Sequence, residues 1–95
     1  MAKIIKMILS YKKAKKIVLF GSRAKETYSG ASDIDIAILD EKWSDKDINI
    51  IKNNLEEHVK TPLKFDVVNY YLLSGKKLRG NILKYGKVIY EPGKN

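Results

Sequence analysis

Two aspartates stand two positions apart in the segment DIDIAIL (33–39), where they alternate with three isoleucines. Successive side chains of a β-strand point to opposite faces of the sheet. A strand here therefore places Asp33 and Asp35 on one face and the isoleucines on the other. Two carboxylates roughly 6–7 Å apart along a strand repel each other unless a cation lies between them. Oxygen ligands of this kind suit Mg²⁺ or Mn²⁺, so the segment predicts a divalent metal site.

A third carboxylate follows from the same reasoning in KFDVVNY (64–70). A strand here places Asp66 on the face away from its apolar neighbours. If this strand pairs beside the strand of the two earlier aspartates, Asp66 joins Asp33 and Asp35 around one point. Three carboxylates in that arrangement are what two-metal phosphoryl or nucleotidyl transfer needs. We therefore expect all three to be catalytic and metal-binding residues.

A phosphate-binding turn is predicted where KIVLF (16–20) is followed by Gly21, Ser22 and Arg23. The first five residues predict a buried strand, and Ser22 predicts the start of a short helix over 22–28. Glycine lets the backbone approach a ligand closely, and the free N–H groups of a helix N-terminus bind anions. Ser22 adds a hydroxyl group and Arg23 a positive charge. These three residues are therefore the expected nucleotide-binding residues.

The charge is distributed unevenly along the 95 residues, in which 19 Lys and Arg outnumber 11 Asp and Glu to give a formal net charge of +8. Residues 1–32 and 76–95 are basic, whereas residues 33–75 are net acidic. This pattern fits a metal-binding centre flanked by phosphate-attracting surfaces, and it disfavours nucleic acid as a direct ligand. The alternative is a solvated basic surface, since 17 of the cations are Lys.

The composition predicts a single domain over residues 1–95, with 44% hydrophobic and 32% charged residues. The absence of cysteine excludes disulfides, zinc–thiolate sites and thiol nucleophiles. The N-terminal residues lack the apolar core of a signal peptide, and no stretch approaches a membrane span of about 20 residues. We therefore expect a cytoplasmic protein without a membrane partner.

Helices and strands are expected to alternate. Helices are predicted over 2–14, over 22–28, from the N-cap Ser44 to Thr61 and Pro62, and over 76–85. Strands are predicted over 16–20, 33–39, 64–70 and 87–91. Gly86 is expected to end the last helix in the left-handed conformation. This order predicts an α+β fold in which helices pack on a mixed four-stranded sheet.

The segment 21–38 resembles the motif of the minimal nucleotidyltransferases of the DNA polymerase beta superfamily. That motif is Gly-Ser, ten residues and Asp-x-Asp, and GSRAKETYSGASDIDIAI has both pairs at this spacing. The third acid of the family lies on a later strand and corresponds to Asp66. The resemblance covers essentially the whole chain. It implies the nucleotidyltransferase fold, ATP or another NTP as the donor, and two Mg²⁺ ions.

The resemblance also implies roles for single residues. Gly21 and Ser22 hold the triphosphate, and Asp33 and Asp35 bind both metal ions. Asp66 binds the catalytic metal and assists deprotonation of the acceptor hydroxyl group. The only histidine, His58, is expected at the surface, while Trp43 and the tyrosines are expected to pack in the core or at a partner interface.

Minimal proteins of this family are typically encoded with a small helical HEPN-type partner, and the two act as antitoxin and toxin. The resemblance thus implies a protein adenylyltransferase that moves AMP to a tyrosine hydroxyl group of that partner. The basic first helix and the basic residues 76–95 are the predicted docking surfaces.

Two hypotheses of other classes stay open beside this one. The first is a binding module that neutralises the partner by contact without catalysis. The second is a basic RNA-binding domain, which the acidic middle of the chain and the lack of an aromatic–glycine motif disfavour. Self-association is also left open by the sequence.

Overall fold

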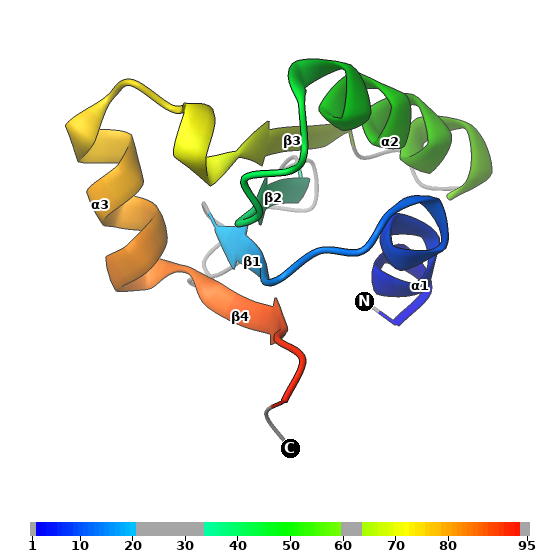
Figure 1. Cartoon of the computed structure of the whole chain (residues 1–95), viewed down its shortest axis with the longest axis horizontal. Helices are drawn as coiled ribbons and strands as arrows, with labels where there is room; N and C mark the ends of the chain where they lie inside the picture. Colours follow the sequence, from blue (N-terminus) through cyan, green and yellow to red (C-terminus); the bar gives the residue numbers. More distant parts are fainter. Residues whose placement is uncertain (1, 21–33, 60–63, 94–95) are drawn as a thin grey trace.

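The computed structural model describes residues 2–20, 34–59 and 64–93 (Figure 1). Their elements are α1 (Ala2–Tyr11), β1 (Ile17–Phe20), β2 (Ile34–Ile38), α2 (Asp45–His58), β3 (Phe65–Asn69), the short 3-10 helix η2 (Tyr70–Leu72), α3 (Lys76–Tyr85) and β4 (Lys87–Tyr90). Every predicted element is present at nearly its predicted bounds, except the helix over 22–28, which lies outside the described residues. Helix α2 ends at His58, with Val59 as its extended C-cap, and so it is shorter than predicted, since Thr61 and Pro62 were expected to end it. None of the described helices combines the length and the apolar character that a membrane crossing requires.

The four strands form one mixed sheet in the order β3-β2-β1-β4. Strand β1 runs antiparallel to both β2 and β4, whereas β2 and β3 are parallel. Parallel neighbours need a crossover connection, and here that connection contains α2. The α+β fold with a mixed four-stranded sheet is therefore confirmed.

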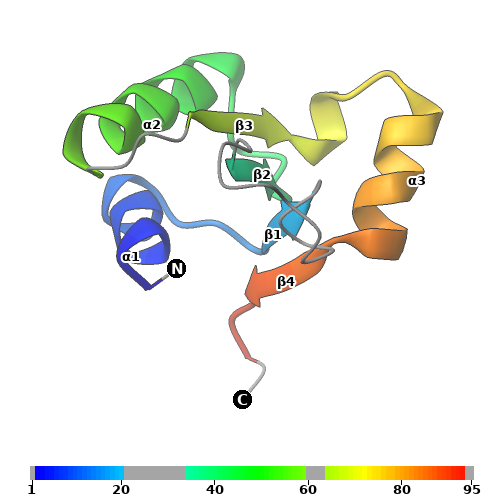
Figure 2. The same ribbon diagram turned by 180° about the vertical axis from the view of Figure 1, so that it is seen from behind.

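The two faces of the sheet are covered by different helices (Figures 1 and 2). Helices α1 and α2 lie on one side and enclose the larger core. Its buried residues are Ile4, Ile8, Ala14, Ile17, Leu19, Ile34, Ile36, Ile38, Trp43, Ile48, Ile51, Leu55, Phe65 and Val67. Helix α3 lies on the other side, over a smaller cluster of Val18, Ala37, Leu39, Tyr70 and Ile82. The predicted alternation of strand side chains accounts for this division.

The start of α2 is fixed by a capping box and tied to the end of α1. The Ser44 hydroxyl group accepts a hydrogen bond from the Asp47 backbone N–H, and the Asp47 carboxylate accepts one from the Ser44 N–H. The Asp47 carboxylate also accepts hydrogen bonds from the Lys12 ammonium group at 2.7 Å and from the Tyr11 hydroxyl group at 2.6 Å. The bonds from Lys12, Tyr11 and Ser44 hold the pKa of Asp47 well below its usual range. The same contact with Asp47 raises the pKa of Tyr11.

A buried polar network, which the sequence reasoning missed, fixes the end of β3. The Asn69 side-chain amide donates to the carbonyl oxygens of Asp40 and Trp43 at 3.0 and 2.6 Å, and it accepts from the Tyr71 N–H at 2.9 Å. The Asp40 carboxylate, itself buried, accepts two backbone N–H groups. Because Asn69 caps η2, the strand ends at Asn69 and not at Tyr70 as predicted.

The prediction that Gly86 ends α3 in the left-handed conformation is wrong. Gly86 has φ −69° and ψ 150°, which is extended backbone. A Cβ atom at this position would overlap the backbone oxygen of Ile82 and lie 2.5 Å from Val18 Cγ1. Glycine is therefore required because the chain passes tightly between α3 and β1, not because of its φ angle.

Candidate active site

Asp35 on β2 and Asp66 on β3 lie directly opposite each other on neighbouring parallel strands. Paired residues in a sheet point to the same face, and neighbouring strands lie about 4.8 Å apart. Asp66 is exposed and Asp35 is half-buried. The expectation that the strand of Asp66 pairs beside that of Asp35 is confirmed, and the two carboxylates share one face.

This face is apolar at one end, where α3 covers it, and carries the two aspartates at the other. Toward the ends of β2 and β3, Ala37 and Val68 belong to the small cluster beneath α3. At the beginnings of the same strands the alternation brings Asp35 and Asp66 to that face, while their neighbours Ile34 and Phe65 are buried on the other. The carboxylate pair therefore lies outside both hydrophobic cores.

The end of β1 lies beside this pair. Phe20, the last described residue before Gly21, is paired with Asp35, on the side away from Asp66. Ile34, the first described residue after segment 21–33, adjoins Asp35 in the chain. The predicted site residues Gly21, Ser22, Arg23 and Asp33 themselves lie outside the described residues.

The donor set of the pair fits a hard divalent cation. Asp35 and Asp66 offer carboxylate oxygens from neighbouring strands, and Mg²⁺ and Mn²⁺ prefer such ligands. Within residues 2–20, 34–59 and 64–93 no group of three His, Cys, Asp or Glu side chains could hold a metal ion. The third ligand that the sequence predicts, Asp33, is not among those residues.

Arg79 is a further charged residue on this face, and the sequence reasoning did not single it out. Its guanidinium group lies over the Tyr70 ring, with Cζ 5.1 Å from the ring centroid. Its Nε atom is buried and has no hydrogen-bond partner among the described residues. Its position three residues before the buried Ile82, on the sheet-facing side of α3, was the available signal.

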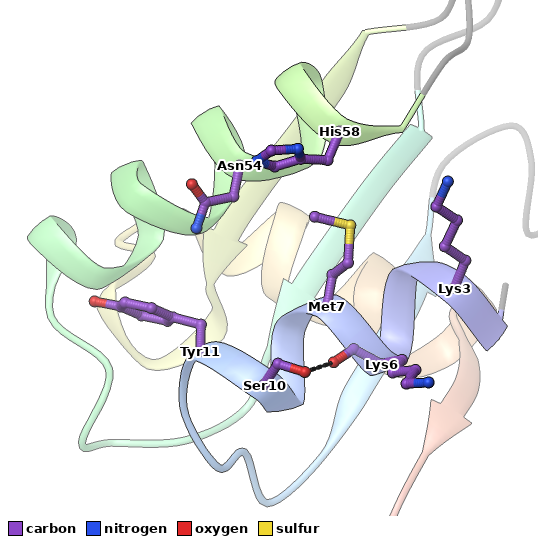
Figure 3. A pocket seen from close by; sticks show the side chains of 7 residues that line it. All are labelled: Lys3, Lys6, Met7, Ser10, Tyr11, Asn54 and His58. Carbon is purple, nitrogen blue, oxygen red and sulfur yellow. Dashed lines mark hydrogen bonds between the residues drawn. The ribbon is translucent and has the colours of Figure 1, made fainter.

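The remaining candidates lie away from the carboxylates. A groove between α1 and α2 is lined by Lys3, Lys6, Met7, Ser10, Tyr11, Asn54 and His58 (Figure 3). In Figure 3 the Met7 side chain extends from α1 toward α2, where His58 and Asn54 lie. His58 is exposed and is therefore a surface histidine, as predicted, and both helices cover the sheet face opposite the carboxylate pair.

Trp43 was expected in the core or at a partner interface, and it lies in the core. It is 1% exposed, and its indole N–H donates to the Lys13 carbonyl oxygen at 2.7 Å. Its ring meets the Tyr11 ring edge-to-face, with the centroids 5.6 Å apart. Of the two tyrosines after β3, Tyr70 is buried and Tyr71 is exposed.

Comparisons with known proteins agree with this fold. A toxin–antitoxin crystal structure with AMP-PNP superposes with a TM-score of 0.81 at 24% identity, over 97% of this chain and 73% of that one. A mutant MntA-HpeT toxin–antitoxin structure gives 0.79 at 21% identity, over 97% and 73%. No curated protein matches the chain. The family model described as polymerase beta, nucleotidyltransferase matches residues 2–95. The chain therefore belongs to the polymerase beta nucleotidyltransferase family.

Proposed function

We propose that the protein is a metal-dependent nucleotidyltransferase that moves AMP, or another nucleoside monophosphate, from an NTP to a hydroxyl group of a partner protein. The observation that carries the proposal is the pairing of Asp35 with Asp66 on one face of the sheet, beside the end of β1 that leads into Gly21 and Ser22. Membership of the nucleotidyltransferase family supports the reaction type.

Each site residue has a defined task in this proposal. Asp33, Asp35 and Asp66 hold two divalent ions, Mg²⁺ or Mn²⁺. Bound metal ions neutralise charge on the triphosphate and favour ionisation of an attacking hydroxyl group. Asp66 lies on the edge strand β3 and is exposed, so an acceptor can reach it from solvent and hydrogen-bond its hydroxyl group to this carboxylate.

The remaining site residues bind the donor nucleotide. Gly21 offers a backbone N–H that a phosphate can approach closely, Ser22 a hydroxyl group, and Arg23 a guanidinium group that pairs with phosphate oxygens. A triphosphate bound by these residues would lie close to Asp35, because Phe20, which precedes Gly21, is paired with Asp35.

The proposed partner is a small helical HEPN-type toxin, whose tyrosine hydroxyl group receives the AMP and whose activity is thereby neutralised. The proposal draws support from the fold shared with two toxin–antitoxin structures, one of which contains AMP-PNP. In the cell the protein then acts as an antitoxin by covalent modification of its partner.

The test is an incubation of the two proteins with α-labelled ATP and Mg²⁺, followed by mass spectrometry of the partner. Its mass is expected to rise in steps of one AMP. Asp66→Asn removes one ligand charge and should slow transfer by about 100-fold or more, because metal ions supply several kcal/mol of transition-state stabilisation. Asp45→Asn, the same substitution at an exposed aspartate of α2, is the matched control and should leave the rate unchanged.

Two results would contradict the proposal. Full transfer by Asp66→Asn would remove this carboxylate from the reaction. Neutralisation of the partner without any gain in mass, undiminished in Asp66→Asn, would mean that contact alone inhibits the toxin.

A further inference from the structure

The exposed large apolar side chains of the described residues are concentrated in one stretch, from η2 to β4. They are Tyr71, Leu72, Leu78, Leu83, Tyr85 and Val88, with exposed fractions between 40% and 60%. A single exposed apolar side chain is normal on a protein surface, whereas a group of them indicates an interaction site. This stretch is therefore a candidate site for binding a partner.

Helix α3 is held on the sheet by one side and leaves its other side uncovered. Ile82 is its only buried residue. In Figures 1 and 2 the other two described α-helices, α1 and α2, lie on the opposite side of the sheet. Helical spacing places Lys76, Lys77, Gly80 and Lys84 on the side opposite Ile82, with Leu83 at one edge of that side, and these five residues are here called the α3 surface. Leu78 and Tyr85 lie outside this surface, on the same side of the helix as Ile82.

The sequence of α3 is unfavourable for an isolated helix. Its N-cap is Gly75, which makes no side-chain capping hydrogen bond, and its first turn contains Lys76 and Lys77 but no acid. Gly80 lies in the middle of the helix, where a Cβ atom would meet nothing within 4 Å. Since the fold gains nothing from these choices, another requirement is expected to explain them. At Gly80 that requirement can be the close approach of a partner.

The charge around α3 identifies the kind of partner. From η2 to Gly93 the chain carries five cations, Lys76, Lys77, Arg79, Lys84 and Lys87, and a single acid, Glu91. The ion pairs of the described part of the chain lie at Lys12, Lys15 and Lys16, outside α3. A second copy of this chain would bring a like-charged surface against this one, which is unfavourable. An acidic surface is complementary to it.

The exposed apolar side chains favour a protein over a nucleic acid as the partner. Single-stranded nucleic acid binds through cations and through aromatic side chains on which bases stack. Four of the six exposed apolar residues, three Leu and one Val, cannot stack on a base. They suit apolar contacts in a protein interface, beside which the lysines of α3 meet acidic side chains.

We propose that the α3 surface is the docking site for the acceptor protein, which meets its lysines with acidic side chains and Leu83 with an apolar one. This inference rests on the proposed function, because it names where the protein that receives AMP is held. Helix α3 packs on the sheet face that carries Asp35 and Asp66. A protein docked on α3 is therefore on the same side of the sheet as the carboxylates, whereas one docked on α1 is behind it.

The test is calorimetric titration with the proposed helical HEPN-type partner, purified separately and free of AMP. Gly80→Gln fills the open position and Leu83→Gln removes the exposed apolar contact, and each is expected to weaken binding about tenfold, as for an interface hot spot. Lys77→Glu reverses a charge and should weaken binding and reduce its dependence on salt. Gly80→Gln and Lys77→Glu both improve the isolated helix, so the melting temperature should not fall.

The matched control is Lys6→Glu, the same charge reversal at an exposed lysine of α1, which should leave the affinity unchanged. Weakened binding for Lys6→Glu and unchanged binding for the three α3 variants would overturn the proposal in favour of α1. Self-association or binding of a 20-nucleotide RNA that the α3 variants abolish, with the affinity for the helical protein unchanged, would overturn it as well.

A parallel measurement of AMP transfer separates this inference from the proposed function. Binding that depends on α3 but is followed by no transfer supports the docking site and contradicts the enzyme. Transfer that continues at the same rate and affinity in all three α3 variants supports the enzyme and contradicts the docking site. Absence of any binding by the unaltered chain contradicts both.

Discussion

Replacing Asp66 with Asn is expected to stabilise the metal-free protein and to abolish its stabilisation by Mg²⁺. Asp66 and Asp35 face the same side of neighbouring strands, which lie about 5 Å apart. Two like charges at this separation repel by about 0.8 kcal/mol in water and by about 3 kcal/mol at the effective dielectric constant of a protein surface. Because Asp66 is exposed, the lower value is the better guide, and we expect a gain of about 1 kcal/mol.

The measurement is urea unfolding at neutral pH and low salt, with EDTA or with 10 mM Mg²⁺. For a site with a dissociation constant of about 1 mM, this concentration adds about 1.4 kcal/mol to the free energy of unfolding. The unaltered protein should gain this amount. Asp66→Asn should start about 1 kcal/mol higher without metal and gain nothing. The substitution thus raises the stability without metal but removes the gain in stability from Mg²⁺, and a general change in stability would not produce both effects.

Asp45→Asn is the control, because it also removes an exposed carboxylate, but at a place where negative charge is favourable. Asp45 lies in the first turn of α2, and loss of its interaction with the helix dipole should cost about 0.5 kcal/mol. The response to Mg²⁺ should be retained. Destabilisation of the metal-free protein by Asp66→Asn, or equal stabilisation of this variant and the unaltered chain by Mg²⁺, would contradict a metal site at Asp66.

Three further predictions concern the scaffold. Asn69→Ala should cost about 3 kcal/mol in urea unfolding, since it removes three hydrogen bonds of a buried side chain worth about 1 kcal/mol each. Gly86→Ala should cost about 1–3 kcal/mol, because the added methyl group overlaps the backbone of α3 and a side chain of β1, and a lowered melting temperature would report it. The pKa of Asp47 is lowered in the folded protein, so its ionised carboxylate stabilises the fold at neutral pH. This stabilisation is lost as the pH falls below about 4, the ordinary pKa of an aspartate. Unfolding measured between pH 6 and pH 2 should therefore show a steeper loss of stability in the unaltered protein than in Asp47→Asn.

The strand faces of this protein were predictable because strand periodicity is a local property. Alternation in DIDIAIL and KFDVVNY assigned Asp35 and Asp66 to faces opposite their apolar neighbours, and the register of β2 against β3 agrees. Ser44 was recognisable as an N-cap, since the capping residues lie within one turn of it. Each of these inferences needed only a few consecutive residues.

Features that depend on distant parts of the chain were not predictable in this way. Asn69 binds backbone groups 26 and 29 residues away, and nothing in its neighbourhood indicates those partners. Gly86 was expected to take the left-handed conformation, because that is the usual reason for glycine after a helix. Its actual reason is a close approach to Val18, 68 positions earlier, which only the folded chain reveals.

The arrangement of the two sheet faces lets the proposed site and docking surface vary without disturbing the main core. That core lies entirely on the α1 and α2 side, and neither Asp35 nor Asp66 belongs to it or to the cluster beneath α3. Helix α3 in turn is anchored through one buried residue, Ile82, so the residues of its outer side contribute little to the fold. Substitutions at the carboxylates and on α3 should therefore change catalysis and docking separately, and each should leave a folded protein in which the other can be measured.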